Sequence, residues 1–254
     1  MQSKCGFSNP QRANLLVEAA MDEAEFDRFA DEYYAQHSAS IRMSGEAPEY
    51  FHRYKIEVVQ RECDRLRFQP RRILDFGGGV GNSIPYMKAL FETAEIALID
   101  PSRRSLDVAR ERHGALATLT HFDGATIPFA DGQIDLAFVA CVFHHIPHDL
   151  HGKLLGELER VLVPGGHLFV FEHNPLNPLT LKAVRDCPFD ENAVLISARN
   201  MKQRIRSAGF VSALSRFTVF FPHALKVFRP AEPWLGRIPI GGQYFVHAIK
   251  GADR

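Results

Sequence analysis

Four glycines follow a short apolar run that ends in aspartate, in the stretch ILDFGGGVGN from residue 73 to residue 82. The apolar run predicts a buried strand, and the glycines predict a backbone that turns tightly and lets a ligand come close. A glycine-rich turn between a strand and a helix is a common cradle for a nucleotide. The spacing of the glycines indicates which nucleotide is expected.

The dinucleotide-binding pattern GxGxxG does not fit this loop. Starting at Gly77, its last position falls on Asn82, and starting at Gly79 it falls on Ile84. The last glycine of that pattern lets the helix approach the strand, so NAD is disfavoured. A P-loop is also excluded, because no Gly-Lys-Ser/Thr follows. The pattern that fits is an apolar strand, then Asp75, then glycines at 77, 79 and 81.

With this pattern the chain resembles the class I S-adenosylmethionine-dependent methyltransferases, in their small-molecule branch. Three further stretches agree in register with that family, namely ALIDPS, HFDGATIPFADGQIDLAFV and LLGELERVLVPGGHLFVFE. The resemblance implies S-adenosyl-L-methionine as cofactor and S-adenosyl-L-homocysteine as product. The cofactor-binding residues that it implies are Asp75, Gly77, Gly78, Gly79, Gly81, Asp100, Pro101, Asp123, Gly124 and Cys141.

Two carboxylates of this set have expected partners on the cofactor. Asp100 would accept hydrogen bonds from both ribose hydroxyls, and Asp123 would accept one from the adenine amino group. Each also has a purely structural explanation. An acid at position 100 can stabilise the N-terminus of the next helix, and Asp-Gly is an ordinary turn.

Histidines gather after the expected fourth strand, in CVFHHIPHDLH. Methyl transfer is an in-line displacement that depends on holding donor and acceptor aligned. An oxygen or carbon acceptor can also need a general base, for which His144 and His145 are the catalytic candidates. The alternative is that both rings only shape the loop. We expect no metal site, because Pro147 breaks any helix that would align the histidines and no neighbouring acid completes a ligand set.

Strands alternate with helices from residue 70 onward, and the strands are apolar on both faces. This pattern predicts an α/β fold, a doubly wound, mostly parallel seven-stranded Rossmann-like sheet. Ligands bind such a sheet at the carboxyl ends of its strands. Strands are expected at 71–76, 94–100, 115–122, 133–141, 167–173, 211–221 and 243–251.

Residues 1–69 are expected to form an N-terminal helical lid over the methyltransferase domain of residues 70–254. Tyr33 and Tyr34 of this lid would reach the substrate, and helix packing is the equal alternative for both tyrosines. A second helix is expected to begin at Pro48, with proline in its first turn. Its Arg53 and Lys55 are interpreted as a solvated face rather than as a site for an acidic substrate.

Two proline-rich insertions, near 174–196 and 222–241, are expected to wall the acceptor pocket. Phe221 and Trp234 are the candidate substrate contacts there, and nearby cations such as Arg229 would sit at the mouth. Packing of the second insertion onto the sheet is the alternative explanation for these aromatic residues.

The composition argues against several classes of function. The 254 residues carry 30 basic and 30 acidic side chains, which gives no basic face for a nucleic-acid partner. No apolar run reaches the ~18 residues of a membrane span. The N-terminus lacks the apolar core of a secretion signal and no two of the four cysteines form a CxxC pair, so a cytoplasmic protein with free thiols is expected.

We therefore expect methyl transfer to oxygen or carbon of a small-molecule acceptor, such as a secondary metabolite, a quinone-like compound or a sugar- or lipid-linked intermediate. The Asn/Asp-Pro-Pro-Tyr signature of enzymes that methylate exocyclic or amide nitrogen is absent. Two alternatives stay open. The chain could use the cofactor for other chemistry in the same fold, or bind it without catalysis.

Overall fold

The computed structural model describes residue 41 and residues 44–252. All strands of this part of the chain form one sheet in the order β3-β2-β1-β4-β5-β7-β6. They are β1 (Arg72–Phe76), β2 (Glu95–Asp100), β3 (Thr118–His121), β4 (Ile134–Ala140), β5 (Leu162–His173), β6 (Ser212–Thr218) and β7 (Gln243–Ile249). The first five strands run parallel, and β7 is antiparallel to both β5 and β6. The predicted mostly parallel, seven-stranded fold is confirmed.

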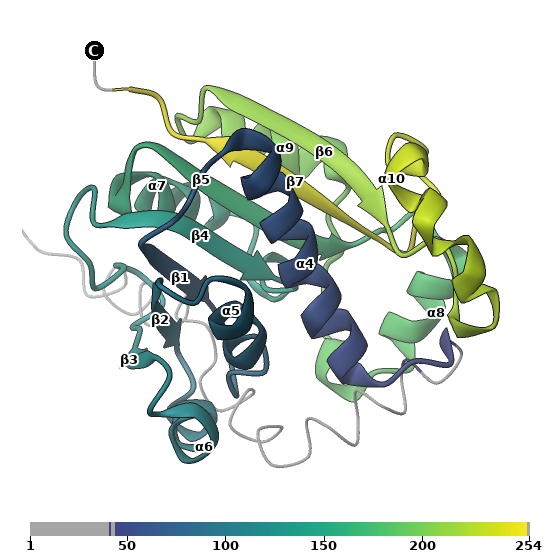
Figure 1. Ribbon diagram of the computed structural model, residues 1–254, viewed down its shortest axis with the longest axis horizontal. Coiled ribbons are helices and arrows are strands. Elements are labelled where there is room, and N and C mark those ends of the chain that lie inside the picture. The colour runs from purple at the N-terminus through teal and green to yellow at the C-terminus, as the bar shows by residue number, and fades with distance from the viewer. Residues whose placement is uncertain (1–40, 42–43, 253–254) are drawn as a thin grey trace, which may run out of the picture.

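Helices cover both faces of the sheet (Figure 1). They are α4 (Pro48–Leu66), α5 (Ile84–Leu90), α6 (Arg103–His113), α7 (His151–Val161), α8 (Pro178–Arg185), α9 (Ala198–Ser207) and α10 (Glu232–Leu235), with 3-10 turns η2 (Phe143–His145), η3 (Pro188–Asp190) and η4 (His223–Ala231). In Figure 1, α4 crosses the near face of the sheet while α7 and α9 lie behind it. None of the described helices combines the length and the hydropathy needed to cross a bilayer.

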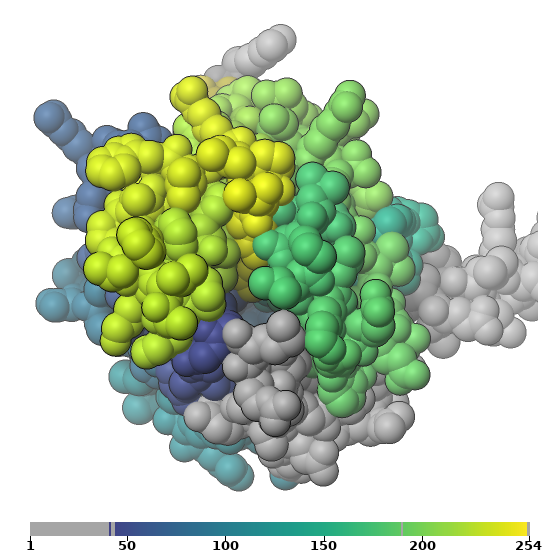
Figure 2. All heavy atoms as spheres, turned by 90° about the vertical axis from the view of Figure 1, so that its right-hand side faces the viewer, coloured from purple at the N-terminus to yellow at the C-terminus, as the bar shows by residue number. Residues whose placement is uncertain are grey.

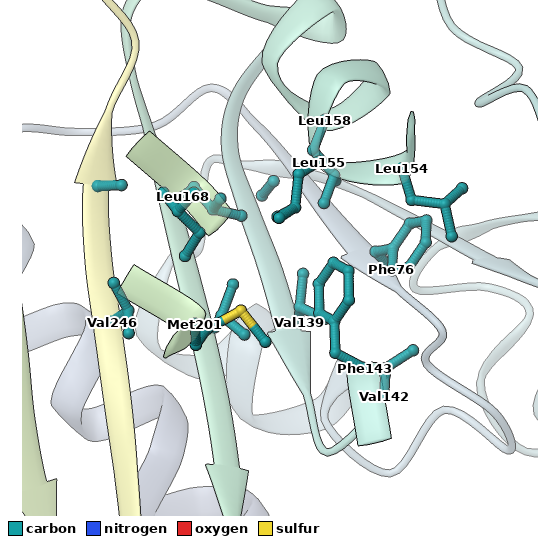
Figure 3. Close-up of a cluster of buried hydrophobic side chains, with 14 of the residues drawn as sticks. Phe76, Val139, Val142, Phe143, Leu154, Leu155, Leu158, Leu168, Met201 and Val246 are labelled. Carbon is teal, nitrogen blue, oxygen red and sulfur yellow. The ribbon is translucent and has the colours of Figure 1, made fainter. Parts of the chain in front are cut away.

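One hydrophobic cluster lies on each face of the sheet. The cluster under α7 and α9 is shown in Figure 3, where Phe76, Val139 and Phe143 meet leucines of α7 and Met201 of α9. Its side chains are almost completely buried, and each large one contributes about 1.5–3 kcal/mol through burial. This packing holds the carboxyl ends of β1 and β4 rigidly beside each other.

The second cluster includes the buried face of α4. This helix starts at Pro48, as expected, and ends where Arg67 adopts a left-handed backbone with φ of 56°. Ile56, Val59 and Cys63 pack with apolar residues of the sheet. The helix α4 therefore packs on one face of the sheet and also lies near the carboxyl ends of the strands. The earlier helix, with Tyr33 and Tyr34, lies outside the described residues.

Two segments differ from the sequence-based expectation. The strand expected at 167–173 already begins at Leu162, which pairs with Ile134 before a bulge, so Pro164, Gly165 and Gly166 lie within β5. The first proline-rich insertion, for which no helix was predicted, contains the helix α8. Asn177 caps that helix by accepting hydrogen bonds from two backbone amides, and Pro178 occupies its first turn.

Candidate active site

The glycine-rich loop between β1 and α5 has two kinds of glycine. A Cβ added at Gly77 would lie 2.8 Å from a methyl group of Val142, and one added at Gly78 would lie 2.5 Å from Leu98. Real Cβ atoms do not approach other atoms so closely, so these positions need glycine for packing within the protein itself. The expectation that every glycine makes room for the cofactor is therefore too simple.

Gly79 is the glycine that faces open space. Its φ of +53° lies in the left-handed region, and a Cβ there would meet no atom within 4 Å. Its backbone N–H donates a hydrogen bond to Oδ2 of Asp100 at 2.8 Å. Bare backbone that opens on empty space, next to a buried carboxylate, suits a flat polar ligand.

Two acids end the neighbouring strands β1 and β2, and both are buried. Asp100 accepts hydrogen bonds from the backbone N–H groups of Gly79 and Ser102. Asp75 is different, because its Oδ2 is buried without a hydrogen-bond partner. Burial, together with the charge of Asp100, raises the pKa of Asp75 to about 7. An orphaned carboxylate oxygen at this place fits a ligand that brings a donor or a positive charge.

The predicted adenine contact lies one strand further along. Asp123 is exposed, and its Oδ1 accepts hydrogen bonds from the N–H groups of Ala125 and Thr126, both at 2.8 Å. These bonds hold the pKa of the carboxyl below its usual range. Asp123 therefore does stabilise a turn, through its Oδ1 atom. Its contact with adenine stays a prediction. Pro101 is buried directly after Asp100, and Gly124 is buried with φ of +78°.

The end of β4 connects the glycine loop to the histidines. Cys141 has a left-handed backbone with φ of 59°, and its N–H donates to Phe171 O at 2.8 Å. Burial raises the pKa of its thiol, so the thiol is protonated at neutral pH. Val142 then packs against Gly77. No disulfide links the described cysteines Cys63, Cys141 and Cys187 to one another.

His144 lies in η2 and is locked to the end of β5. Its Nδ1 is 2.5 Å from Oε2 of Glu172, whose Oε1 accepts the N–H of Phe143 at 2.8 Å. Both side chains are buried. Burial opposes protonation of His144, but Glu172 and Asp190 outweigh it and raise its pKa. A histidine held as a cation in this way cannot take a proton from an acceptor.

Asp190 of η3 completes this cluster. Its Oδ1 lies 3.4 Å from Nε2 of His144 and 3.4 Å from Nε2 of His145. The expectation that no acid joins the histidines was therefore wrong. The reason is tertiary, since the first insertion folds back over η2 and Val194 N–H bonds to His144 O at 2.8 Å. Burial and the neighbouring charge of His144 lower the pKa of His145 to about 4, so its ring is neutral.

The other two histidines of the motif do not join the cluster. His148 is exposed. His151 is buried in α7, where its Nε2 lies 2.9 Å from Ile146 O and its Nδ1 contacts Arg204. These partners satisfy the ring of His151, which makes it part of the packing of α7 against α9.

Residues 74–170 match the family model described as a methyltransferase domain. These residues therefore form a methyltransferase domain of the class I S-adenosylmethionine-dependent kind. The matched segment runs from β1 through most of β5, so it contains the glycine loop, both buried acids and the paired histidines. S-adenosylmethionine is the cofactor, as in the related methyltransferases.

Similar proteins agree with this assignment. A demethylmenaquinone methyltransferase of Thermus thermophilus is 36% identical over 113 residues, which are 43% of this chain and 50% of that protein. The ubiquinone/menaquinone biosynthesis C-methyltransferase UbiE of Chromobacterium violaceum is 34% identical over 115 residues, which are 42% of this chain and 46% of that protein. The methyltransferase thus spans about half the length of the curated relatives that it matches.

Solved structures share the fold. A methyltransferase of Thermotoga maritima, described as a possible histamine N-methyltransferase, has a TM-score of 0.61 and 20% identity, covering 89% of this chain and 98% of that one. At this identity the likeness concerns the fold alone.

In the methyltransferase, both insertions meet at the carboxyl edge of the sheet, which Figure 2 shows as α8 and the segment of η4 and α10 on either side of a notch. Buried Asn174 donates its side-chain amide to Pro239 O and Gly241 O. Asn177 donates to Ile240 O at 2.7 Å. The sequence did not predict that the two asparagines of the NPLNP stretch join the two insertions. It did contain the signal for the start of α8, which is an asparagine cap followed by proline.

The second insertion is also bound to α4. Buried Glu232 accepts hydrogen bonds from the N–H groups of Phe220 and Phe221 and from the hydroxyl of Tyr54. Arg229 pairs with Glu46 at 2.6 Å, and its guanidinium also lies 4.3 Å from the ring centre of Tyr50. Glu46 thus already pairs with Arg229, and a place for Arg229 at the pocket mouth stays a prediction.

Lys55 of α4 lies at the same edge. Its interpretation as part of a solvated face was wrong, since it is 6% exposed. The helical period puts it on the side of Phe51 and Val59, which face the sheet, while Arg53 points outward and pairs with Glu57. The charge of Lys55 acts on Cys141, so the amine belongs to the site region.

The two candidate substrate contacts of the second insertion differ. Phe221 is partly exposed, with its ring 5.8 Å from that of Phe228. Trp234 is 83% exposed, so it does not pack onto the sheet. Contact with an acceptor stays a prediction for both residues.

Proposed function

We propose that this protein transfers the methyl group of S-adenosylmethionine to an oxygen or carbon atom of a small, largely apolar acceptor. The observation that carries the proposal is the contact between Val142 and Gly77, which puts the histidine cluster beside the glycine loop. When bound, the cofactor supplies an electrophilic methyl group on a sulfonium. A reactive carbon held there would lie next to titratable side chains at the carboxyl ends of β4 and β5.

Asp75, Gly79 and Asp100 would hold the cofactor. The open backbone at Gly79 and the unpaired oxygen of Asp75 fit such a ligand. Asp100 accepts backbone N–H groups with both of its oxygens, and because a carboxylate oxygen can accept more than one hydrogen bond, it would also accept the ribose hydroxyls. Gly77, Gly78 and Gly81 would shape this cradle from behind.

An apolar acceptor is supported by the surface near the carboxyl edge. Large apolar side chains are exposed there in the two insertions, and they include Leu176, Leu179, Val227, Phe228, Trp234 and Ile240. The relatives named above act on quinones according to their names, which also favours a quinone-like or lipid-linked acceptor. The exposed ring of Trp234 would rest on such a molecule.

We assign activation of the acceptor to the cluster of His144 and His145. Proton transfer by either ring alone is inefficient, because His144 is already protonated and a base with a pKa of about 4 is too weak for a hydroxyl. The two histidines would therefore activate the acceptor together, and neither ring would act as an independent general base.

Two measurements test the proposal. Calorimetry should show cofactor binding that is weakened about ten- to a hundredfold by Asp100→Ala, because a buried charge-assisted contact is worth about 1.5–3 kcal/mol. Exposed Asp107→Ala on α6 is the matched control. Incubation with S-adenosylmethionine and a short-chain demethylated quinol should release S-adenosylhomocysteine and a methylated quinone. Cofactor binding without S-adenosylhomocysteine release from any quinol, catechol or hydroxylated aromatic acceptor would contradict methyl transfer to this class.

A further inference from the structure

Three side chains from two distant segments converge beside the proposed acceptor site. They are His144 and His145 of η2 and Asp190 of η3. One ligand atom from each of them, an imidazole nitrogen or a carboxylate oxygen, lies within 4.8 Å of the other two. Each nitrogen is 3.4 Å from Oδ1 of Asp190.

This spacing suits a metal ion better than hydrogen bonds. A directed N–H···O bond has its heavy atoms about 2.9 Å apart. Two ligands bound to one ion at about 2.1 Å with a tetrahedral angle are about 3.4 Å apart. Consistent with this, Nε2 of His144 is buried and has no hydrogen-bond partner. A buried nitrogen without a partner, aimed at a carboxylate and a second imidazole, is what an absent cation would leave.

The surroundings orient the ligand atoms. Glu172 lies 2.5 Å from Nδ1 of His144 and so holds the proton on that nitrogen. A bound ion would take the place of the other proton of the imidazolium, the one on Nε2, which faces the centre of the cluster. The N–H of Phe143 fixes Glu172 in turn. A carboxylate behind a histidine ligand is the usual outer shell of a metal site. The hydrogen bond from Val194 N–H to His144 O ties the segment after Asp190 to η2.

The three ligands differ in burial. The side chains of His144 and Asp190 are 1% and 6% exposed, whereas that of His145 is 11% exposed. An ion would therefore enter on the side of His145, and each of the three residues would supply one ligand atom. Three protein ligands with a free position are typical of reactive rather than purely structural metal sites.

We propose that His144, His145 and Asp190 bind a divalent transition-metal ion of the zinc or iron(II) class, with an open coordination position toward the acceptor. Two histidines and one carboxylate are a ligand set known for both ions. The role of the ion rests on the proposed function. An acceptor hydroxyl bound at the open position would lose its proton to solvent, and its oxygen would then form a bond to the methyl carbon. The carbon–sulfur bond would break with its electron pair left on sulfur.

Metal titration tests the site without any acceptor. The full chain, stripped with a chelator and dialysed, is titrated with Co²⁺ while the visible d–d bands are recorded, and with Zn²⁺ in competition. We expect one Co²⁺ ion per chain, with the d–d bands that are typical of a Co²⁺ ion with few ligands. His145→Ala and Asp190→Ala should each weaken binding by more than about a hundredfold, and Glu172→Gln by about ten- to a hundredfold. Exposed His148→Ala is the matched histidine control and should bind like the wild type.

Cofactor calorimetry on the same samples separates this proposal from the proposed function. The ligand variants should bind S-adenosylmethionine as the wild type does, because the glycine loop is untouched. A wild-type chain that binds no Co²⁺ at micromolar concentration, or variants that bind it as well as His148→Ala does, would overturn the metal site and leave cofactor binding intact. If Asp190→Ala fails to fold, the more exposed His145→Ala decides the question, and circular dichroism verifies its fold.

Discussion

At the scale of single residues, the glycines of the loop are required for two different reasons, packing within the protein and space for a ligand. Gly77 and Gly78 lie against Val142 and Leu98, so they are needed even in the absence of a ligand. Gly79 has open space in front of it, so apart from its left-handed backbone it needs to be glycine only if a ligand fills that space. The cofactor-binding role can therefore be separated from the folding role by substitution at neighbouring positions.

Gly79→Ala should leave the protein folded but weaken cofactor binding at least about tenfold. The left-handed backbone costs alanine about 1 kcal/mol, and the new methyl group would occupy the space in front of the loop. Gly78→Ala is the matched comparison, because its Cβ would clash with Leu98 and should lower the melting temperature strongly. Thermal melts and calorimetry check both variants. Normal cofactor affinity in folded Gly79→Ala would place the cradle elsewhere.

Asp75 makes stability depend on pH. Its pKa is about 7 in the folded protein, against about 3.9 in an unfolded chain. Between these values the folded state keeps a proton that the unfolded state has lost. Raising the pH through this window therefore lowers the free energy of unfolding. Asp75→Asn should remove this part of the fall in the free energy of unfolding. The stability of the variant relative to the wild type should therefore increase from about pH 4 to about pH 7.

Urea unfolding of both proteins without cofactor, at several pH values, measures this difference. Exposed Asp131→Asn, whose carboxyl pairs with Arg160 on the surface, serves as a control for a carboxylate lost elsewhere. If the free energies of unfolding of the wild type and Asp75→Asn change in parallel with pH, the raised pKa of Asp75 is contradicted. Because Asp75 is also proposed to meet the cofactor, the stabilised variant should bind S-adenosylmethionine more weakly.

At the scale of elements, alternation of apolar runs and amphipathic segments was enough to predict the sheet and most of its helices. Local signals also gave the start of α4 at Pro48. The helix α8 was missed, although Asn177 and Pro178 form a normal helix start, because its segment was treated only as a proline-rich insertion. The signal was local and could have been found.

The meeting of Asp190 with the two histidines could not be predicted in the same way. It depends on a long insertion that returns to η2, and no periodicity in the sequence records which residues of an insertion face a distant turn. The same holds for Asn174, whose amide reaches two carbonyl groups more than sixty positions later. Strand ends could be predicted as the site, but the side chains that complete the site come from the insertions.

Asn174→Ala should loosen the joint between the two insertions. The buried amide donates to Pro239 O and Gly241 O, and its own oxygen accepts the N–H of Leu176. Leaving these groups unpaired should lower the free energy of unfolding by about 1–3 kcal/mol. Exposed Asn200→Ala on α9 should change it little. Urea denaturation measures both, and equal stabilities of the two variants would contradict this role for Asn174.

At the scale of the whole molecule, the rigid and the adaptable parts are separated. The two hydrophobic clusters fix the strands, and the proposed cofactor residues are on turns that directly follow them. The proposed acceptor side would be built instead from α4, α8 and the segment of η4 and α10, which are joined by polar contacts such as Tyr54 to Glu232. A pocket built this way could change its acceptor by changing the insertions, while the cofactor half stays the same.

Trp234 tests this division, because its exposure makes stability and acceptor binding separable. With 83% of the residue exposed, Trp234→Ser should change the free energy of unfolding by less than about 0.5 kcal/mol, whereas loss of a packed tryptophan would cost about 3–5 kcal/mol. Cofactor affinity should be unchanged. If the ring supports an apolar acceptor, KM should rise for a quinol with a long isoprenoid tail and less for one without a tail. Lys226→Ser on the neighbouring turn is the matched control for a surface change. A destabilised Trp234→Ser variant, or one with the same KM as the wild type for both quinols, would remove Trp234 from the acceptor site.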